Sequence, residues 1–218
     1  MVRKASSMLE LVIAIVVMGI SVMTLPILLS QTEKNNSYAI QQEVILAART
    51  KIGDTLTYRW DENSLINDRI VILVTDGDSE LNATNGIRRI GNVFGNKRRK
   101  FSPDLNTSTP VANLGSDGGD LDDIDDFNAQ TDTLQATMET TALDYKLKDF
   151  NISTTVAYIS DNADYSSSVL SFTLDDNNIS HTSNIKMLTL DVTGIDFPFV
   201  LRSYSCNIGE SELLRRVW

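Results

Sequence analysis

The first third of the chain contains a long stretch in which every position is uncharged. From Leu11 to Leu29 no residue carries a charge. Nineteen residues at a rise of ~1.5 Å span about 28 Å, close to the thickness of a bilayer's hydrocarbon core. Soluble helices are seldom apolar on every face over such a length, which argues against a buried helix of a soluble protein. The pattern predicts a membrane-spanning helix over residues 6–30.

Two other interpretations of this stretch concern targeting. A cleavable secretory signal has a shorter apolar region that ends in a small-x-small site. Here the run is too long, it contains Pro26, and the residues that follow, LLSQT, make a poor cleavage site. An ordinary single-pass anchor fits the length better. Against it stands Glu10, because a carboxylate in lipid costs a few kcal/mol or more unless it finds a partner.

The next segment, residues 31–60, has apolar residues at three- and four-residue intervals. Ile40, Val44, Ile52 and Leu56 share one face. The opposite face is polar and carries Gln41, Glu43, Arg49, Lys51 and Asp54. This period is typical of an amphipathic helix that packs one face on a sheet. We expect a stalk helix that continues from the membrane span.

Beyond residue 60 the pattern changes to short runs of β-branched and aromatic residues. Strands are predicted at 69–75, 87–94, 150–160, 167–174, 185–192 and 198–208. The connections between them are rich in Asp, Asn, Ser and Gly, which favour turns. One long helix followed by clustered strands indicates an α+β fold, with an antiparallel sheet packed on the stalk in a head domain of residues 61–218. The interval 95–149 is an insertion, predicted to be partly helical at 132–143.

Charge is divided unevenly along the chain. The net charge is −10, but residues 1–100 balance to +3 and residues 101–218 to −13. Acidity of this kind repels phosphates and opposes nucleic acid as a general partner. The one cysteine, Cys206, excludes an intrachain disulfide, and His181 is the only histidine. We expect Cys206 to be buried on a late strand and His181 to lie in a surface loop.

A short motif surrounds Glu10. Lys4-Ala5 is followed by Ser6-Ser7-Met8-Leu9-Glu10-Leu11 and then by the apolar helix. This arrangement resembles the signal of type IV prepilins and type II secretion pseudopilins. That signal has a short basic leader, a small residue before the cut, four mostly apolar residues and then Glu. In this chain Ala5 stands where Gly is usual, and Ser6 stands where Phe or Met is usual.

The resemblance implies a processing and assembly route. A prepilin peptidase would remove residues 1–5 by cutting between Ala5 and Ser6, and would methylate the new amine of Ser6. In a filament Glu10 would pair with the N-terminal ammonium of a neighbouring subunit. Gly19 and Pro26 fall at or near positions where family helices carry these residue types. The partners implied are other pilin subunits, the peptidase, an inner-membrane assembly platform and membrane lipid.

The resemblance also implies a place and a rank for the subunit. The helix would cross the inner membrane once, with basic residues of the leader in the cytoplasm and the head in the periplasm. After assembly the head would lie in a periplasmic or cell-surface filament. The long insertion and the atypical Ser6 suit a minor subunit better than the bulk pilin, with a weak similarity to minor pilins of mannose-sensitive haemagglutinin type.

The insertion contains a strongly acidic stretch, GSDGGDLDDIDDFN, at residues 115–128. Its six carboxylates are Asp117, Asp120, Asp122, Asp123, Asp125 and Asp126. Calcium takes six to eight oxygen ligands, and such clusters supply them, although the spacing is not that of an EF-hand. The alternatives are a Ca²⁺ site and a solvated acidic loop without metal. The apolar residues Leu121, Ile124 and Phe127 are expected to anchor a short helical turn while the carboxylates project outward.

Other functions find less support in the residues. The basic cluster at 96–100, NKRRK, has no interleaved aromatic residues of the kind that bind single strands, so we do not expect nucleic acid as a partner. No nucleophile–base set, phosphate-cradling glycine loop or zinc spacing indicates an enzyme. The main alternative to a pilus or pseudopilus subunit is a permanently membrane-anchored periplasmic binding module, which could depend on calcium.

Overall fold

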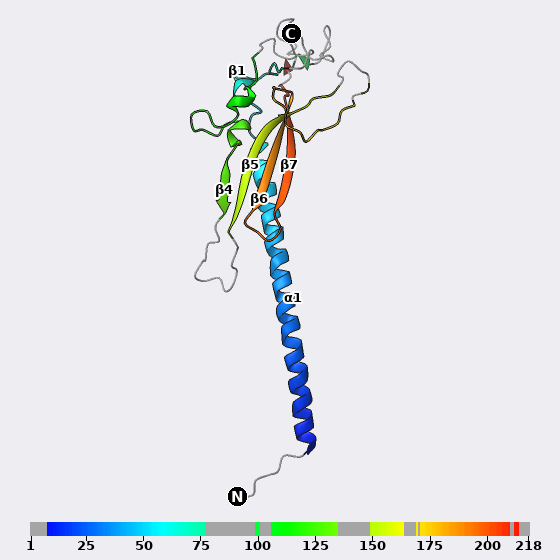
Figure 1. The fold of residues 1–218 in the computed structure, drawn as a ribbon. Helices are drawn as coiled ribbons and strands as arrows, with labels where there is room; N and C mark the ends of the chain where they lie inside the picture. The colour runs from blue at the N-terminus through cyan, green and yellow to red at the C-terminus, as the bar shows by residue number, and fades with distance from the viewer. Residues whose placement is uncertain are drawn as a thin grey trace. The chain divides into compact units, whose positions relative to one another are not determined.

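The computed structural model describes residues 8–76, 99–100, 106–134, 149–163, 169, 171–209 and 212–213. The chain divides into two compact units, Met1–Leu46 and Ala47–Trp218. One long helix supplies the described part of the first unit and the beginning of the second. All strands of the described residues lie in the second unit (Figure 1). From here on, the head means this unit, Ala47–Trp218, which begins earlier than the predicted head domain of residues 61–218.

The helix α1 runs without interruption from Met8 to Thr55 and includes Pro26. Its large apolar side chains between Met8 and Leu29 are exposed. By length and composition, α1 is the one helix in the described part of the chain that could cross a membrane. An α-helix satisfies its own backbone hydrogen bonds, so exposed apolar side chains of this kind are suited to lipid. The predicted continuity of the apolar run with the amphipathic segment is confirmed.

The helix ends at Thr55, five residues before the predicted end at residue 60. Its last turn tightens, because Thr57 N donates to Asp54 O at 2.9 Å and Tyr58 N donates to Thr55 O at 3.2 Å. β-branched and aromatic residues such as Thr57 and Tyr58 lose side-chain freedom in a helix, which favours this exit. The part of α1 that belongs to the head is attached there by Lys51, whose Nζ lies 2.9 Å from Asp132 Oδ2.

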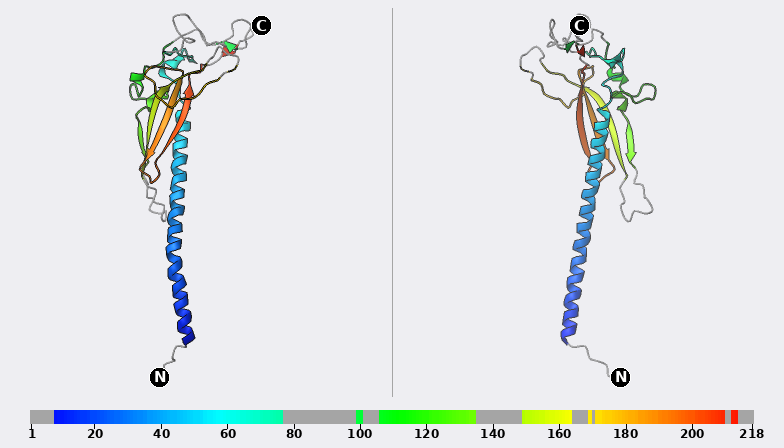
Figure 2. Two further views of the ribbon diagram at one scale, coloured as in Figure 1. Left: turned by 45° about the vertical axis from the view of Figure 1, so that its right-hand side comes forward. Right: turned by 180° about the vertical axis from the view of Figure 1, so that it is seen from behind.

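The centre of the head is a four-stranded antiparallel sheet in the order β4-β5-β6-β7. Figure 2 shows it from two further directions, with β4 and β7 at opposite edges. The strands are β4 (Thr131–Leu134), β5 (Phe150–Ile159), β6 (Ile185–Thr193) and β7 (Phe199–Cys206). The predicted α+β fold is confirmed, as are the three strands predicted at 150–160, 185–192 and 198–208.

One face of the sheet is almost fully closed to solvent. Alternate residues of a strand point to the same face, so the register decides which side chains meet there. Tyr158 pairs with Lys186 and Val156 with Leu188. The residues of β5 and β6 on this face are Ile152, Thr154, Val156, Tyr158, Lys186, Leu188, Leu190 and Val192, all of them buried. A lysine therefore stands in a row that is otherwise mainly apolar.

Several short elements surround the sheet. Asn67 and Asp68, with φ of 51° and 60°, join β1 to β2, and residues with positive φ are what a tight two-residue hairpin requires. The short elements are η1 (Glu62–Ser64), β1 (Leu65–Ile66), β2 (Arg69–Ile70), β3 (Arg99–Lys100), η4 (Val111–Asn113), η5 (Asp125–Phe127) and β8 (Glu212–Leu213). Strand β3 pairs with β8.

Three secondary-structure predictions were wrong in part. In the run 69–75 only Arg69–Ile70 forms a strand, because the buried Val71 and Leu73 pack in the core, where Leu73 N donates to the Asn207 side chain instead of to a neighbouring strand. Residues 132–134 of the helix predicted at 132–143 belong to β4 instead, since they pair with β5, and residues 135–143 lie outside the described residues. No strand occurs in the described residues of 167–174, and the prediction at 87–94 lies outside the described residues.

The single cysteine and the single histidine are both exposed. Cys206 lies on β7 as predicted, but its side chain is exposed and not buried, because Cys206 is the last residue of the strand. His181 lies in an exposed loop before β6, as predicted.

Candidate functional site

The acidic segment, residues 115–128, folds as a compact loop that enters η5. Gly118 and Gly119 adopt φ of 110° and 91°, in the region that only glycine occupies readily. The loop is closed by a hydrogen bond from Ser116 Oγ to Asp120 O of 3.1 Å. These two glycines therefore allow the tight turn of the loop.

Apolar side chains attach the acidic segment to the core. Ile124 and Phe127 are buried, with exposed fractions of 1% and 2%, and they share a side because a 3₁₀ turn has three residues. The Phe127 ring lies 5.0 Å from that of Tyr58 and 4.7 Å from Lys51 Nζ. Leu121, by contrast, is 41% exposed, because it precedes the turn that carries the other two. The predicted anchoring holds for two of the three residues.

Two carboxylates of the segment hold its backbone. Asp123 Oδ1 accepts hydrogen bonds from the N–H groups of Asp125 and Asp126 at 2.9 and 3.1 Å. Asp126 Oδ2 accepts from those of Asp122 and Asp123 at 2.9 and 3.2 Å. Both side chains are buried, so the prediction that the carboxylates all project outward was wrong. These carboxylates turn inward because the free N–H groups of the turn need acceptors.

Arg59 fastens the acidic segment to the chain that leaves α1. Its backbone carbonyl accepts a hydrogen bond of 2.8 Å from Ile124 N, and its guanidinium contacts the Asp122 carboxylate. The same guanidinium lies 3.3 Å from Glu62. Asp122 Oδ1 is buried without a hydrogen-bond partner among the described residues. The Asp122 carboxylate thus contacts the Arg59 guanidinium, and this contact competes with binding of the carboxylate to a metal ion.

A fully buried lysine lies beneath the segment. Lys186 has no exposed surface, and its Nζ donates to Asp125 Oδ1 at 2.5 Å, Asp61 Oδ2 at 2.9 Å and Trp60 O at 2.7 Å. The same nitrogen lies 4.3 Å from the centre of the Trp60 ring and 5.4 Å from that of Tyr158. All three protons of the ammonium therefore have an oxygen acceptor, as a buried cation requires.

Asp61 is held from several sides. Its Oδ1 accepts from Asn63 N and Thr109 Oγ1, each at 3.1 Å, and its Oδ2 accepts from Thr109 N at 2.9 Å as well as from Lys186. The Tyr158 hydroxyl donates to Thr109 O at 2.8 Å. Hydrogen bonds to a carboxylate stabilise its charged form. Asp61 therefore joins η1, the loop at Thr109 and β6.

Burial changes the acidity of the inner carboxyl groups. Removal from water and the charge of the nearby Asp125 together raise the pKa of Asp123 to about 8, against the opposing effect of Lys186. Burial also raises the pKa of Asp125, although the Lys186 ammonium acts in the opposite direction. The group thus places more carboxyl groups than cations in a region of low polarity, and a proton on Asp123 relieves this excess.

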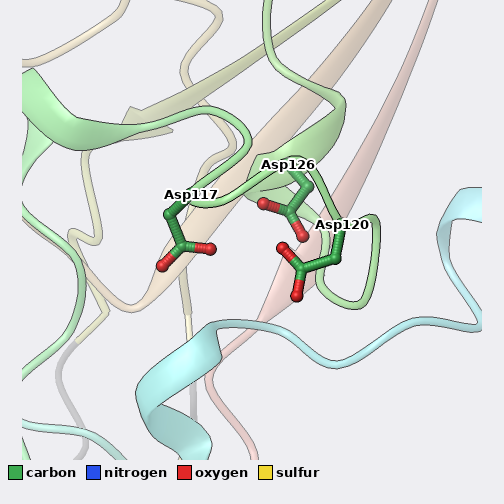
Figure 3. Close-up of side chains that lie close together, drawn as sticks. All are labelled: Asp117, Asp120 and Asp126. Carbon is green, nitrogen blue, oxygen red and sulfur yellow. The ribbon is translucent and has the colours of Figure 1, made fainter.

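A second group of carboxylates lies on the outer side of the segment. One oxygen each of Asp117, Asp120 and Asp126 lies within 4.8 Å of the others, and Figure 3 shows the three side chains directed toward one another. Asp117 and Asp120 are exposed, whereas Asp126 is buried. A hollow of about 290 Å³ adjoins Asp117 and Asp126 and is also lined by Glu62, Asn63 and Asn113. Carboxylate oxygens, such as those of Asp117, Asp120 and Asp126, are the ligands that hard cations prefer.

The six predicted metal ligands therefore divide by position. The structure brings together Asp117, Asp120 and Asp126. It directs Asp122 to Arg59, Asp123 to the backbone and Asp125 to Lys186. Only the first three remain candidates for a shared cation, and Ca²⁺ binding stays a prediction.

The sequence-predicted processing and assembly residues lie at the start of the chain. Ala5 and Ser6 lie outside the described residues. Glu10 lies in the first turn of α1, and Gly19 and Pro26 lie further along the same helix. An added Cβ at Gly19 would meet no atom within 4 Å, so the fold of this chain places no steric demand for glycine there.

The sequence analysis did not identify Lys186 and Asp61, which form the buried ion-pair cluster together with Asp125. A signal for Lys186 was present, because strand alternation places it on the face of Leu188 and Leu190. A charged residue on an apolar face demands a partner. The sequence contained no comparable signal for Asp61, which lies far from Lys186 along the chain.

No protein-family model, curated protein or solved structure matches the chain significantly.

Proposed function

We propose that this protein is a structural subunit, of the minor class, in a type IV pilus or a type II secretion pseudopilus. The observation that carries the proposal is α1, which continues from an exposed apolar segment that begins beside Glu10 into the head without a break. Such a helix can anchor the subunit in lipid before assembly and pack against other subunits afterwards. The sequence resemblance around Ala5, Ser6 and Glu10 supports the same function.

The proposed route assigns a place to each part. The helix crosses the inner membrane once, a prepilin peptidase cuts between Ala5 and Ser6 and methylates Ser6, and the assembly platform moves the subunit into a filament. In the filament Glu10 meets the ammonium of a neighbouring subunit. A charge pair in a medium of low polarity is much stronger than the same pair in water, so Glu10 would favour one register of assembly.

The variant Glu10→Ala tests this function. We expect the amount of the variant subunit in sheared filaments to fall by about tenfold or more. The free energy lost with a charge pair in a medium of low polarity exceeds the roughly 1.4 kcal/mol that a tenfold change represents. Membrane insertion, measured by fractionation, should not change. Glu33→Ala on the same helix is the matched control and should assemble normally.

Two results would contradict the pilin function. One is normal assembly of Glu10→Ala. The other is an intact mass of the filament subunit that still includes residues 1–5. Either result would favour the alternative, a permanently anchored periplasmic binding module.

A cation site is a second candidate function, favoured by the grouping of Asp117, Asp120 and Asp126 beside the hollow. We expect Ca²⁺ to bind with a Kd on the order of 10⁻⁴–10⁻³ M, as in extracellular modules. At a concentration 10–100 times Kd it should raise the free energy of unfolding by about 1.4–2.7 kcal/mol. Calorimetric titration and thermal unfolding would measure both effects.

Matched variants distinguish Ca²⁺ binding at this site from non-specific binding of Ca²⁺ to the acidic surface. Asp117→Asn and Asp120→Asn should each weaken the stabilisation by Ca²⁺, whereas Asp191→Asn, which changes an exposed carboxylate of β6, should not. Equal stabilisation of all three variants would exclude a site at this group.

A further inference from the structure

The surroundings of Lys186 Nζ have the geometry of a nucleophile in contact with an electrophile. The nitrogen lies between two carboxylates, Asp125 at 2.5 Å and Asp61 at 2.9 Å, with Trp60 O at 2.7 Å as the third neighbour. If the ammonium gives one proton to Asp61, the remaining amine can keep two hydrogen bonds, to Asp61 and Trp60 O. The lone pair that this proton leaves faces Asp61 at first, and a rotation about the Cε–Nζ bond turns it toward Asp125.

The group is also closed to water. Lys186 and Asp61 have no exposed surface, and Asp125 has 3%. Trp60 and Tyr158 cover the nitrogen, and Val71 and Leu73 belong to the same apolar cluster. Holding two groups in fixed contact replaces an encounter in solution by an internal step, which is worth several orders of magnitude in rate. The exclusion of water also protects an amide product from hydrolysis.

The two carboxylates differ in how they are held. Asp61 accepts three further hydrogen bonds, from Asn63 N, Thr109 N and Thr109 Oγ1, which stabilise its negative charge. A carboxylate held in this way is a poor electrophile, and its contact with Lys186 Nζ places it where it can pass protons to and from the nitrogen. The Asp125 contact with Lys186 is the shorter of the two, and Asp125 lies on the rigid turn η5, fixed by Ile124 and Phe127.

From this geometry we propose that Lys186 and Asp125 form an intramolecular isopeptide bond, with Asp61 as the catalytic residue. Lys186 Nζ bonds to Asp125 Cγ, and one Cγ–O bond breaks. The ammonium and the carboxylate together lose one water and leave a neutral amide. Asp61 transfers two protons in turn from the nitrogen to the departing oxygen and ends as it began. No oxidant, cofactor or external reactant is required.

The bond would remove two buried charges and tie β6 to the acidic segment. Elimination of an ion pair from a region of low polarity removes its desolvation cost. A covalent link also prevents the segment from separating from the sheet when the head is pulled. This modification is independent of the proposed filament function and would form equally in an anchored binding module.

The test is the mass of the purified full-length chain after complete denaturation, where ion pairs make no contribution. Tryptic peptides are then mapped by fragmentation. We expect a linked peptide pair that joins Lys186 to Asp125, lighter than its two parts by the mass of one water, with no tryptic cleavage after Lys186. Separate, unmodified peptides with cleavage after Lys186 would overturn the proposal, as would a link from Lys186 to Asp61.

Variants assign the roles. Asp125→Ala should abolish the linked pair, and Asp61→Asn should lower its fraction by at least tenfold while Lys186 and Asp125 remain. Asp132→Ala, which changes a carboxylate that pairs with Lys51 on the outside of the head, is the control and should keep the link. A full yield of the link in Asp61→Asn would overturn the role of Asp61. The measurement on the unaltered chain decides the bond itself even if a variant fails to fold.

Discussion

Lys186→Met is expected to lower the free energy of unfolding of the head by about 3–5 kcal/mol, the usual cost of removing one partner from a buried charge group. The substitution leaves the side-chain volume nearly unchanged but removes the nitrogen that contacts Asp61 and Asp125, so that neither an ion pair nor an amide can form there. Both carboxylates then remain buried without compensation. Urea unfolding, followed by the fluorescence of Trp60 in the core, measures the loss.

Two comparisons test the cause of this loss. Lys51→Met removes a partly exposed pair with Asp132 and should cost no more than about 1 kcal/mol. The double variant Lys186→Met with Asp125→Leu replaces the pair by apolar groups, and should recover part of the stability because no charge of that pair stays buried. A cost for Lys186→Met no greater than that for Lys51→Met would contradict the central role of the buried lysine.

The second large effect is a loss of head stability as the pH rises. Asp123 has a pKa of about 8 in the folded head, raised by burial and by the Asp125 charge, against about 4 in an unfolded chain. The folded state therefore binds a proton more tightly than the unfolded state. The stability that this proton contributes is fully present below about pH 4 and is lost as the pH rises through about 8, with a slope of at most roughly 1.4 kcal/mol per pH unit.

Asp123→Asn isolates this contribution. The amide keeps an oxygen that can accept from the N–H groups of Asp125 and Asp126, but it cannot ionise. We expect the melting temperature of the unaltered chain to decrease as the pH is raised from 5 to 8. In the variant this decrease should be less steep. A midpoint that rises with pH in this window, or equal slopes in the two proteins, would show that Asp123 does not carry the effect.

Part of the fold could be predicted because it depends on patterns within single segments. The helix α1 follows from an uncharged run and an adjoining amphipathic period, and β5, β6 and β7 follow from runs of β-branched and aromatic residues. Strand β4 could not be predicted in this way. Its residues Thr131–Leu134 form a strand only because the edge of β5 offers them hydrogen bonds, which is a tertiary effect.

The acidic segment shows the same division more sharply. Its apolar residues correctly indicated a short helical turn that Ile124 and Phe127 anchor. Its six aspartates looked equivalent in the sequence, yet they occupy three different environments. Which carboxylate is buried depends on the direction of each side chain in the turn, and that direction is decided by backbone N–H groups, Arg59 and Lys186.

The sequence by itself determined the apolar helix, the acidic residue at its start, the α+β class and the place of the acidic turn, because each rests on the order of residues along one segment. Only the tertiary structure decided that Lys186 meets Asp61 and Asp125. Lys186 comes from β6, Asp61 from the start of η1 and Asp125 from η5. Contacts among such distant segments depend on distances in space, which no pattern within one segment of the sequence encodes.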